Sequence, residues 1–326
     1  MPEPLLSIEQ LTVTFRTEHG PVQVVDIEQL TVGRNEVVGL VGESGCGKSS
    51  VALSILGLHP AHAARVGGRV VLEGRNLVGL SERELQKIRG SKVAMIFQDP
   101  ATAFNPVFTV GEQLMRVIRT HKGGTQRQAR ARALELLELV GMPDPAGVSC
   151  RYPHQLSGGQ RQRIMIAVAL SCGPDLLIAD EPTTALDVTI EAQILDLLKQ
   201  LQRQFGMGVL LITHDLGVVA RTCDRVAVMY AGRVVEEAPV ADLFRRPAHP
   251  YSRGLLGSLP RRGQELRPIG GTVPDLRHLP PGCRFAPRCP LAVPTCTTHD
   301  PKLIDFGSGR SAACPVVHAE EVGVRD

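Results

Sequence analysis

Tryptophan is absent from this chain of 326 residues, and aromatic residues together make up only 3% of it. Proteins that bind single-stranded nucleic acid stack bases on aromatic side chains, so this shortage argues against that class. The chain also lacks a large excess of charge of either sign, because it has 36 Lys and Arg and 33 Asp and Glu, which gives a formal net charge of +3. Nucleic-acid binding depends on strongly basic surfaces, and we therefore expect no nucleic acid among the partners.

Long apolar runs are also missing. A membrane-spanning helix needs about 20 mostly apolar residues, and apolar segments such as residues 164–170 are much shorter. Residues 1–10 show no basic segment followed by an apolar one, which a secretory signal peptide would have. We expect an intracellular protein that reaches a membrane only through a partner.

Short apolar segments alternate with helical patterns along the chain, which predicts an α/β fold. Near-continuous hydrophobicity is typical of parallel strands that are covered on both faces. Such strands are predicted at residues 37–41, 93–97, 176–179, 209–213 and 225–230. Residues 5–15 and 22–32 alternate between apolar and polar side chains instead, and they predict an antiparallel layer.

Helix starts are marked by capping boxes. Ser81 and Thr125 are each followed three residues later by Glu or Gln, which is the capping-box pattern. The helix after Thr125 is expected to end at Gly141, and another amphipathic helix follows Thr189. The mostly helical residues 99–163 interrupt the strand series and predict an inserted helical subdomain.

The texture of the chain changes near residue 245. Proline and arginine become frequent, and periodicity fades between residues 245 and 281. This composition indicates a linker-rich extension rather than more sheet. We therefore predict a main domain at residues 1–244 and a C-terminal extension at residues 245–326.

Residues 42–49, Gly-Glu-Ser-Gly-Cys-Gly-Lys-Ser, match the phosphate-binding loop and lie between a predicted strand and a helical stretch. Glycines let backbone N–H groups point at phosphate oxygens, and the helix N-terminus attracts the same anion. Lys48 is expected to reach the terminal phosphates, and Ser49 to bind Mg²⁺. The expected nucleotide contacts are Gly42, Ser44, Gly45, Cys46, Gly47, Lys48, Ser49 and Ser50.

Cys46 lies inside this loop and has two interpretations. A helix N-terminus lowers the pKa of a thiol, which would make Cys46 reactive. The other interpretation, which we favour, is that cysteine replaces a serine of similar size.

Residues 176–181, Leu-Leu-Ile-Ala-Asp-Glu, predict an apolar strand that ends in two acids. Asp180 is expected to contact Mg²⁺, directly or through water. Glu181 is expected to orient and polarise the attacking water. Two acids after a strand are a weak signal alone, but after a phosphate-binding loop they indicate NTP hydrolysis.

A second anion site is predicted at residues 156–160, Leu-Ser-Gly-Gly-Gln. Ser157 and Gln160 form a capping box, so a helix should begin here with Gly158 and Gly159 in its first turn. One terminal phosphate needs only one such site in the chain. We infer that Ser157, Gly158, Gly159 and Gln160 serve the ATP held by another cassette.

The order of these motifs resembles the ATPases of ABC transporters over about three quarters of the chain, and it implies a P-loop NTPase core that binds MgATP. The resemblance also assigns roles to Gln98 and His214. Without it, we would interpret Gln98 as a surface residue and His214 as an ordinary loop histidine. The resemblance implies that Gln98 senses Mg²⁺ and water, that Asp187 in residues 185–187 communicates across a dimer, and that His214 contacts the γ-phosphate. Phe15 is the candidate to stack on adenine, or else a core residue.

Three further stretches resemble the importers of dipeptides, oligopeptides and nickel. They are residues 98–106, 249–256 and 281–290. The first follows Gln98, where members of this family grip the membrane subunit. The resemblance therefore implies an importer, with peptides as the leading cargo and nickel or another small solute as the alternative.

Four of the eight cysteines cluster late in the chain, at Cys283, Cys289, Cys296 and Cys314. Four thiolates suit zinc or an iron–sulfur cluster. Structural zinc usually has tighter ligand spacings, so the spacing and the resemblance together favour a [4Fe–4S] cluster. Zinc and unliganded thiols remain alternatives, and His299 or His318 would be the substitutes for Cys314.

The resulting prediction is an ATPase subunit on the cytoplasmic face of the membrane. The expected partners are a second, related cassette, two permease subunits and, indirectly, an extracytoplasmic binding protein. A soluble ABC ATPase is disfavoured because long coiled-coil insertions and a second P-loop are lacking. Export is disfavoured because exporters commonly fuse the cassette to membrane spans.

Overall fold

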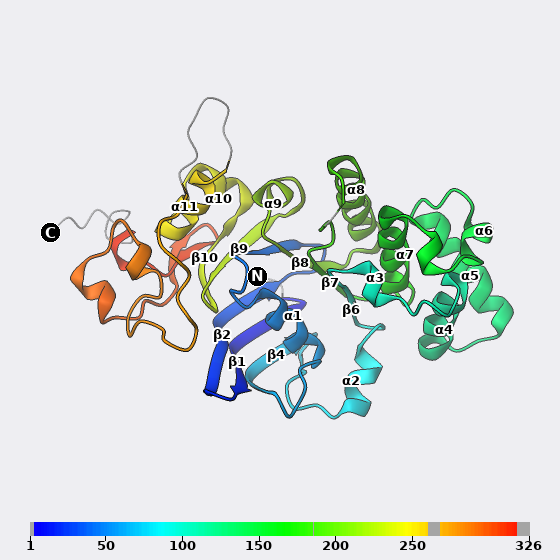
Figure 1. The fold of residues 1–326 in the computed structure, drawn as a ribbon, viewed down its shortest axis with the longest axis horizontal. Helices are drawn as coiled ribbons and strands as arrows, with labels where there is room; N and C mark the ends of the chain where they lie inside the picture. Colours follow the sequence, from blue (N-terminus) through cyan, green and yellow to red (C-terminus); the bar gives the residue numbers. More distant parts are fainter. Residues whose placement is uncertain (1–2, 185, 260–267, 318–326) are drawn as a thin grey trace. The chain divides into compact units, whose positions relative to one another are not determined.

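The computed structural model describes residues 3–184, 186–259 and 268–317. Two predicted positions, Ala185 and His318, lie outside these ranges. The chain forms two compact units (Figure 1). Unit 1 comprises Met1–Leu5, Val32–Val37 and Gly79–Ile212, and unit 2 comprises Leu6–Thr31, Val38–Val78 and Thr213–Asp326.

Unit 1 contains three parallel strands in the order β8-β7-β6. They are β6 (Val93–Ile96), β7 (Leu176–Asp180) and β8 (Gly208–Thr213). Every residue of β7 and β8 is buried, as expected for strands covered on both faces. Because the strands are parallel, their carboxyl ends lie at one edge, which is where loops carry ligands in such sheets.

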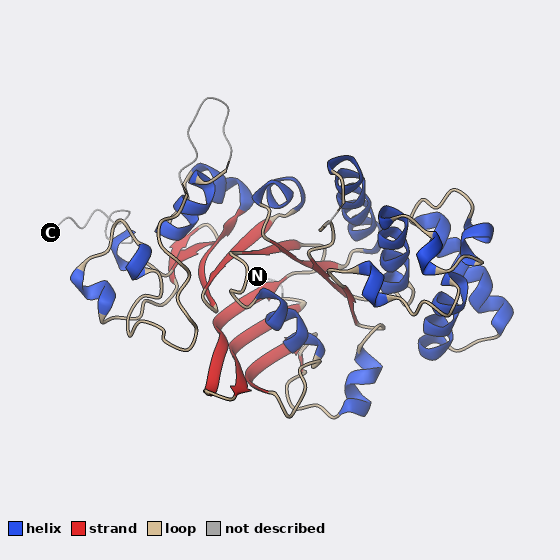
Figure 2. Cartoon of the chain, viewed as in Figure 1, coloured by secondary structure: helices blue, strands red, loops and turns tan. Residues whose placement is uncertain are grey.

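The helices of unit 1 begin where side chains cap them. Capping boxes start α2, α4, α5 and α7, so the predicted starts at Ser81, Thr125 and Ser157 are confirmed. Figure 2 shows the helical part of this unit. The helices are α2 (Glu82–Ile88), α3 (Pro100–Ala103), α4 (Val110–Lys122), α5 (Gln126–Leu139), α6 (Pro145–Ser149), η1 (Pro153–Gln155), α7 (Gly158–Leu170) and α8 (Val188–Phe205).

Unit 2 contains the predicted antiparallel layer, with strands in the order β2-β1-β4-β5. These are β1 (Leu6–Thr17), β2 (Gly20–Val32), β4 (Ala64–Leu72) and β5 (Arg75–Asn76). The strands β1 and β4 pair in antiparallel register from Leu6 opposite Leu72 to Phe15 opposite Ala64. Buried and more exposed residues alternate along β1, so one face packs on the core.

The other strands of unit 2 have the order β11-β12-β10-β9-β3. Parallel pairing joins β3 (Val37–Val41) to β9 (Arg225–Tyr230). Antiparallel pairing then adds β10 (Arg233–Pro239), β12 (Arg310–Ala312) and β11 (Ile304–Gly307). The helices are α1 (Lys48–Leu56), α9 (Leu216–Thr222), α10 (Val240–Arg245), α11 (Pro250–Gly257), η2 (Ala286–Arg288) and η3 (Pro294–Thr297).

One predicted feature was wrong. The chain after residue 245 does add sheet, because β12 pairs with β10 through Glu236 opposite Ala312. The amphipathic helix expected after Thr189 is present as α8, and it begins at Val188 because the side chain of Asp187 accepts the N–H of Ile190 and caps it. In the described residues, no helix has both the length and the apolar character needed to span a bilayer.

His249 caps α11 from a fully buried position, and its Nδ1 accepts the N–H of Tyr251 at 3.1 Å. Burial, and secondarily Arg253, lowers the pKa of His249 from 6.5 to about 3. The unfolded chain therefore binds a proton below pH 6.5 that the folded chain does not. The contribution of His249 to the free energy of unfolding is highest above pH 6.5. It decreases as the pH falls from 6.5 toward 3, by up to about 1.4 kcal/mol per pH unit.

We accordingly expect the His249→Asn variant to lose less stability than the wild type between pH 7 and pH 5. Asparagine also caps helices but does not titrate. Urea unfolding at both pH values measures the difference. The exposed His278, replaced in the same way, is the control for the histidine-to-asparagine change itself. Equal pH dependence in the wild type and His249→Asn would contradict this role.

Candidate active site

The loop at residues 42–49 joins β3 to α1 in unit 2, as the strand–loop–helix context predicts. Gly47 caps α1 with φ of 105°, and a Cβ there would lie 2.6 Å from the carbonyl oxygen of Val24. Only glycine fits this close approach without strain. Ser44, Gly45 and Ser49 are exposed, while Gly42 is buried and Ser50 half-buried.

Lys48 is the first residue of α1, and its side chain folds back into the phosphate-binding loop. Its side chain is 6% exposed, and Nζ donates to the carbonyl oxygens of Gly42 at 2.8 Å and Glu43 at 3.1 Å. An ammonium group is a compact charge on a flexible stem. The Nζ of Lys48 also donates to the thiol of Cys46 at 3.7 Å. The geometry thus places a cation within the phosphate-binding loop, held by neutral groups that a phosphate can replace.

Cys46 is buried within the loop. It is 1% exposed, and burial raises the pKa of its thiol against the opposing effect of Lys48. These observations favour the interpretation of Cys46 as a packing residue over a thiol activated by the helix N-terminus. Its carbonyl oxygen accepts the N–H of Gly232 at 2.9 Å, which ties the loop to the end of β9.

Glu43, the second residue of the loop, is held by the C-terminal part of the chain. Its N–H donates to the hydroxyl of Tyr251 at 3.0 Å. Its carboxylate accepts two N–H groups of Arg288, at 2.8 and 3.1 Å. Tyr251 and Arg288 were not among the predicted site residues, although both lie in stretches that resemble peptide importers.

Phe15 lies on β1 in a half-buried position. Its ring meets the edge of His59, with ring centroids 5.6 Å apart and planes at 80°. His59 in turn contacts the carbonyl oxygen of Ser50 at 2.9 Å. An aromatic ring is thus linked to the start of α1, which is compatible with either stacking on a base or packing.

Gln98 and Glu181 meet at the carboxyl ends of β6 and β7 in unit 1. The side-chain amide of Gln98 donates to Glu181 Oε2 at 2.8 Å, and the hydroxyl of Thr184 donates to the same oxygen at 2.9 Å. Two residues that the sequence singled out separately are therefore brought together. Thr184 is a further member that had no recognisable signal.

The backbone of Glu181 adopts a left-handed conformation with φ of 46°. For a residue with a side chain this costs about 1–2 kcal/mol, and such strain concentrates at functional sites. The N–H of Glu181 donates to the carbonyl oxygen of Ile212 at 2.8 Å, which holds the turn. Asp180, the last residue of β7, is only 5% exposed.

The helix α7 begins at the Leu-Ser-Gly-Gly-Gln motif. The exposed Ser157 accepts the N–H of Gln160 and donates its own N–H to the Gln160 side chain. A Cβ on Gly159 would lie 2.8 Å from the side chain of Ile190, so this turn packs closely against α8. A 13-residue helix therefore presents a serine hydroxyl and glycine amides at its positive end.

The remaining two candidates occupy loop positions. Asp187 is exposed, and one of its carboxylate oxygens accepts the N–H of Ile190 at 2.9 Å. His214 is exposed directly after β8. The structure gives Asp187 a local capping role, and it places His214 at the carboxyl end of a strand.

Cys283, Cys289, Cys296 and Cys314 all line one cavity of about 330 Å³ in unit 2. Phe285 and His299 are among the other side chains around it. Among the described residues, no three His, Cys, Asp or Glu side chains are arranged to hold a single metal ion. None of the eight cysteines, all of which are described, forms a disulfide.

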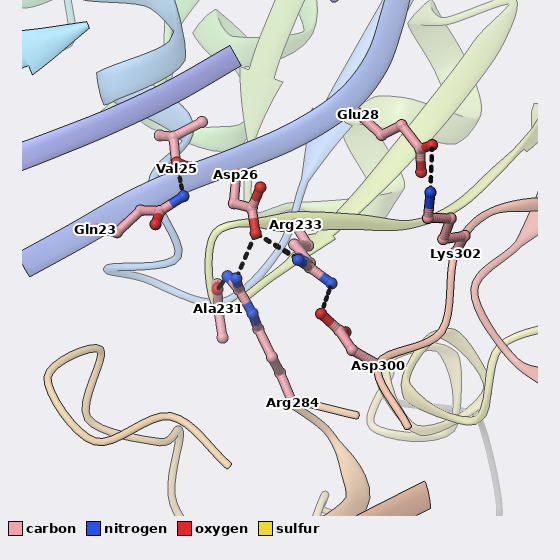
Figure 3. Close-up of polar contacts among 9 residues, drawn as sticks. All are labelled: Gln23, Val25, Asp26, Glu28, Ala231, Arg233, Arg284, Asp300 and Lys302. Atoms are coloured by element: carbon pink, nitrogen blue, oxygen red, sulfur yellow. Dashed lines mark hydrogen bonds and ion pairs between the residues drawn. The ribbon is translucent and has the colours of Figure 1, made fainter. Parts of the chain in front are cut away.

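Ion pairs fasten the cysteine-rich segment to the neighbouring strands of unit 2 (Figure 3). Arg284 donates to Asp26 on β2 at 2.7 Å and to the carbonyl oxygen of Ala231 at 2.5 Å. Arg233 on β10 shares Asp26 and also pairs with Asp300. The segment between Cys283 and Cys289 therefore carries two anchoring arginines, Arg284 and Arg288.

Comparison with known families divides the chain into two matched parts. Residues 25–184 match the family described as ABC transporter. Residues 235–296 match the family described as oligopeptide/dipeptide transporter, C-terminal region. The second match covers Tyr251 and Arg288, and it includes three of the four clustered cysteines.

Two relatives from Bacillus subtilis align over most of the chain. The oligopeptide transport ATP-binding protein AppD is 51% identical, over 95% of this chain and 96% of its own. The dipeptide transport ATP-binding protein DppD is 53% identical, over 90% of this chain and 89% of its own.

Solved structures agree with this similarity. The dimeric ATP-binding cassette MJ0796, in a post-hydrolysis state with ADP and Pi, is 30% identical with a TM-score of 0.64 and covers 72% of this chain and 98% of its own. CbiO1 of Clostridium perfringens is 26% identical, also with a TM-score of 0.64, and covers 75% of this chain and 92% of its own. With its phosphate-binding loop, acidic strand end and Ser157 helix, the chain belongs to the ABC transporter family, as an ATP-binding cassette with the oligopeptide/dipeptide transporter C-terminal region.

Proposed function

We propose that this ABC-type ATPase couples the binding and hydrolysis of ATP to the uptake of short peptides. The observation that carries the cargo assignment is the double match. Both the cassette and the C-terminal region align with ATP-binding proteins named for oligopeptide and dipeptide transport. Nickel or another small solute is the second candidate, because a cassette of this kind does not itself bind the cargo.

In this proposal, MgATP is the substrate and the loop residues supply positive charge. Lys48 moves from its carbonyl partners to the terminal phosphates, and Ser49 and Asp180 act on Mg²⁺. Charge neutralisation and orientation, rather than covalent chemistry, then lower the barrier to phosphoryl transfer. The adenine stacks on Phe15, and the other loop residues named above cradle the phosphates.

Glu181 orients the attacking water, and Gln98 is its immediate partner. The 2.8 Å contact between them supports this pairing, because a change at Gln98 directly alters the carboxylate. Gln98 is thereby suited to report Mg²⁺ and water to the membrane subunit. His214 is assigned to the γ-phosphate, and Asp187 to communication between cassettes.

The proposed working unit contains two cassettes and two permease subunits. Ser157, Gly158, Gly159 and Gln160 bind the ATP held by the other cassette, which we propose to be a related but distinct chain. ATP then favours the closed pair because only that state makes contacts with both chains. We place the chain peripherally on the cytoplasmic face, with an extracytoplasmic binding protein as an indirect partner.

Uptake into vesicles tests the cargo. We expect proteoliposomes holding the complete transporter and its binding protein to accumulate radiolabelled di- to pentapeptides only with ATP on the cassette side. The same vesicles should not accumulate Ni²⁺. Uptake of Ni²⁺ without peptide uptake would replace the peptide proposal and leave the ATPase assignment intact.

We further propose that the four cysteines hold a [4Fe–4S] cluster, which would clip the extension together. One shared cavity of about 330 Å³ supports this, because a cluster is wider than one ion and its thiolates stand farther apart. Burial, then the neighbouring Cys296 and Cys314, raises the pKa of Cys283 to about 11. Binding must therefore release protons, and assembly should weaken at lower pH.

Metal analysis distinguishes the three alternatives for these cysteines. Anaerobically purified protein should carry about four iron and four sulfide ions per chain and absorb visible light. Cys296→Ser should lose most of both, whereas the exposed Cys150→Ser is a matched control that should keep them. Stoichiometric zinc, or the absence of both metals in fresh protein, would overturn the cluster proposal.

A further inference from the structure

The phosphate-binding loop is held from outside by two side chains of the C-terminal extension. Tyr251 accepts the N–H of Glu43, and Arg288 binds its carboxylate. These residues lie 208 and 245 positions away in the sequence. A phosphate-binding loop needs only its own glycines, lysine and helix, so these distant contacts are an addition to the motif.

Arg288 is rigidly placed. Its side chain is only 5% exposed, and besides Glu43 it donates to the carbonyl oxygen of Gly270 at 2.8 Å. Its guanidinium also approaches the hydroxyl of Tyr230 at 3.4 Å. A planar guanidinium that binds a carboxylate through two N–H groups fixes direction as well as distance, which an ammonium group cannot do.

Tyr251 is equally constrained. It is fully buried, and its ring packs against Tyr230 and Phe285 with centroids 4.6 and 5.4 Å away. Burial raises the pKa of Tyr251, so its hydroxyl stays neutral and accepts the N–H of Glu43. Packing in the aromatic cluster therefore fixes the position of the Tyr251 hydroxyl that accepts this hydrogen bond.

The same segment reaches the loop at a second point. Arg284 binds the carbonyl oxygen of Ala231 (Figure 3). The following residue, Gly232, donates its N–H to the carbonyl oxygen of Cys46 within the loop. Arg284 and Arg288 therefore act on opposite ends of the central loop residues. This double attachment restricts the backbone between Glu43 and Cys46.

Lys48 connects these anchors to the chemistry, because its Nζ donates to the carbonyl oxygen of the same Glu43. A residue whose N–H, carbonyl group and carboxylate are all bound has little freedom to turn. We propose that Tyr251 and Arg288 are positioning residues of the ATP site, holding Glu43, and through its carbonyl group Lys48, in place for the terminal phosphates. This inference rests on the proposed ATPase function.

A purely structural staple makes a different prediction from a positioning contact. A staple that only attaches the extension would lower the melting temperature and the active fraction, and therefore kcat, without changing KM for ATP. A displaced loop binds phosphate less well in every folded molecule, which raises KM and the Kd of ATP. Comparing the change in KM for ATP with the change in kcat therefore distinguishes a positioning contact from a structural staple.

The experiment compares Arg288→Gln and Tyr251→Phe with the wild type in the assembled transporter. We expect KM for ATP to rise about tenfold in Arg288→Gln and about threefold in Tyr251→Phe, since small misplacements weaken phosphate contacts. Arg288→Lys should recover part of the loss, because it keeps the charge. Arg277→Gln removes an exposed ion pair with Asp275 in the same extension, and it should leave KM unchanged.

A double-mutant cycle tests whether the effect passes through Glu43. Glu43→Gln combined with Arg288→Gln should raise KM no more than the larger single change, because both remove one interaction. Unchanged KM in both Arg288→Gln and Tyr251→Phe, or fully additive effects in the cycle, would overturn the inference. Failure of the proposed function is distinguished because the wild type itself would then hydrolyse no ATP.

Discussion

Glu181→Gln is expected to slow ATP hydrolysis by about 10²–10⁴-fold, the usual contribution of a positioned general base. ATP binding should persist, because the glutamine has nearly the same size. Its carbonyl oxygen can still accept from Gln98 and Thr184, which now bind Glu181 Oε2. The substitution therefore removes the charge and basicity of the group while retaining its local contacts. Phosphate release under steady-state conditions measures the rate.

The control for this prediction is Glu191→Gln on α8. Glu191 is also half-buried and also accepts a threonine hydroxyl, from Thr183 at 2.9 Å. We expect its hydrolysis rate to stay within about twofold of the wild type, as for changes away from the reacting atoms. Because Glu181→Gln retains ATP without turnover, it should also accumulate ATP-bound dimers with its partner cassette. Unimpaired hydrolysis in Glu181→Gln would remove Glu181 from the role of base.

Lys48→Met is expected to abolish most hydrolysis by a different route. It removes the ammonium group from the loop but keeps an unbranched side chain of similar reach. Charge-assisted hydrogen bonds contribute about 1.5–3 kcal/mol each, so ATP affinity should fall about 10–100-fold. Turnover should fall further, because the lysine also neutralises charge that develops in the transition state. Equilibrium binding of a fluorescent ATP analogue measures the first effect.

The matched control is Lys87→Met, which changes an exposed lysine on α2. Both its affinity and its turnover should equal those of the wild type. Lys48→Met and Glu181→Gln thus separate binding from chemistry, since one loses affinity and the other retains it. If Lys48→Met bound ATP as tightly as the wild type, the loop at residues 42–49 would not be the phosphate site.

Local signals in the sequence were reliable where the structure is determined locally. The starts of α2, α5 and α7 follow from a side chain that caps backbone three residues away, so the pattern contains the whole interaction. The strand at residues 37–41 is likewise marked by its continuous hydrophobicity. The helix expected after Thr189 is α8, which begins at Val188 because Asp187 supplies the capping oxygen.

Long-range pairing could not be predicted in the same way. The strands β11 and β12 are only four and three residues long, and the partner of β12 on β10 lies more than 70 positions earlier. The Gly-Ser-Gly turn at residues 307–309 was the only local sign of this hairpin. Short strands carry too few residues for periodicity to distinguish them from loops.

In the candidate site, too, local motifs could be predicted from the sequence and long-range contacts could not. Motifs with a fixed spacing identified the phosphate-binding loop, the Asp180–Glu181 pair and the Ser157 helix. The contact of Gln98 with Glu181 needed the structure, because the two residues are 83 positions apart. The attachment of Glu43 to Tyr251 and Arg288 left no trace in the sequence beyond the resemblance of their surroundings to peptide importers.

In the proposed dimer, one ATP is bound by the loop of this cassette and by the helix start of another chain that corresponds to Ser157. Orthovanadate trapped with ADP cleaves nearby backbone when irradiated, so it maps what surrounds the γ-phosphate. In the assembled transporter with MgATP, we expect light-dependent cleavage of this chain at residues 42–49 and again at residues 157–160. Cleavage at the loop alone, with the Ser157 region intact in the fully assembled complex, would contradict the account.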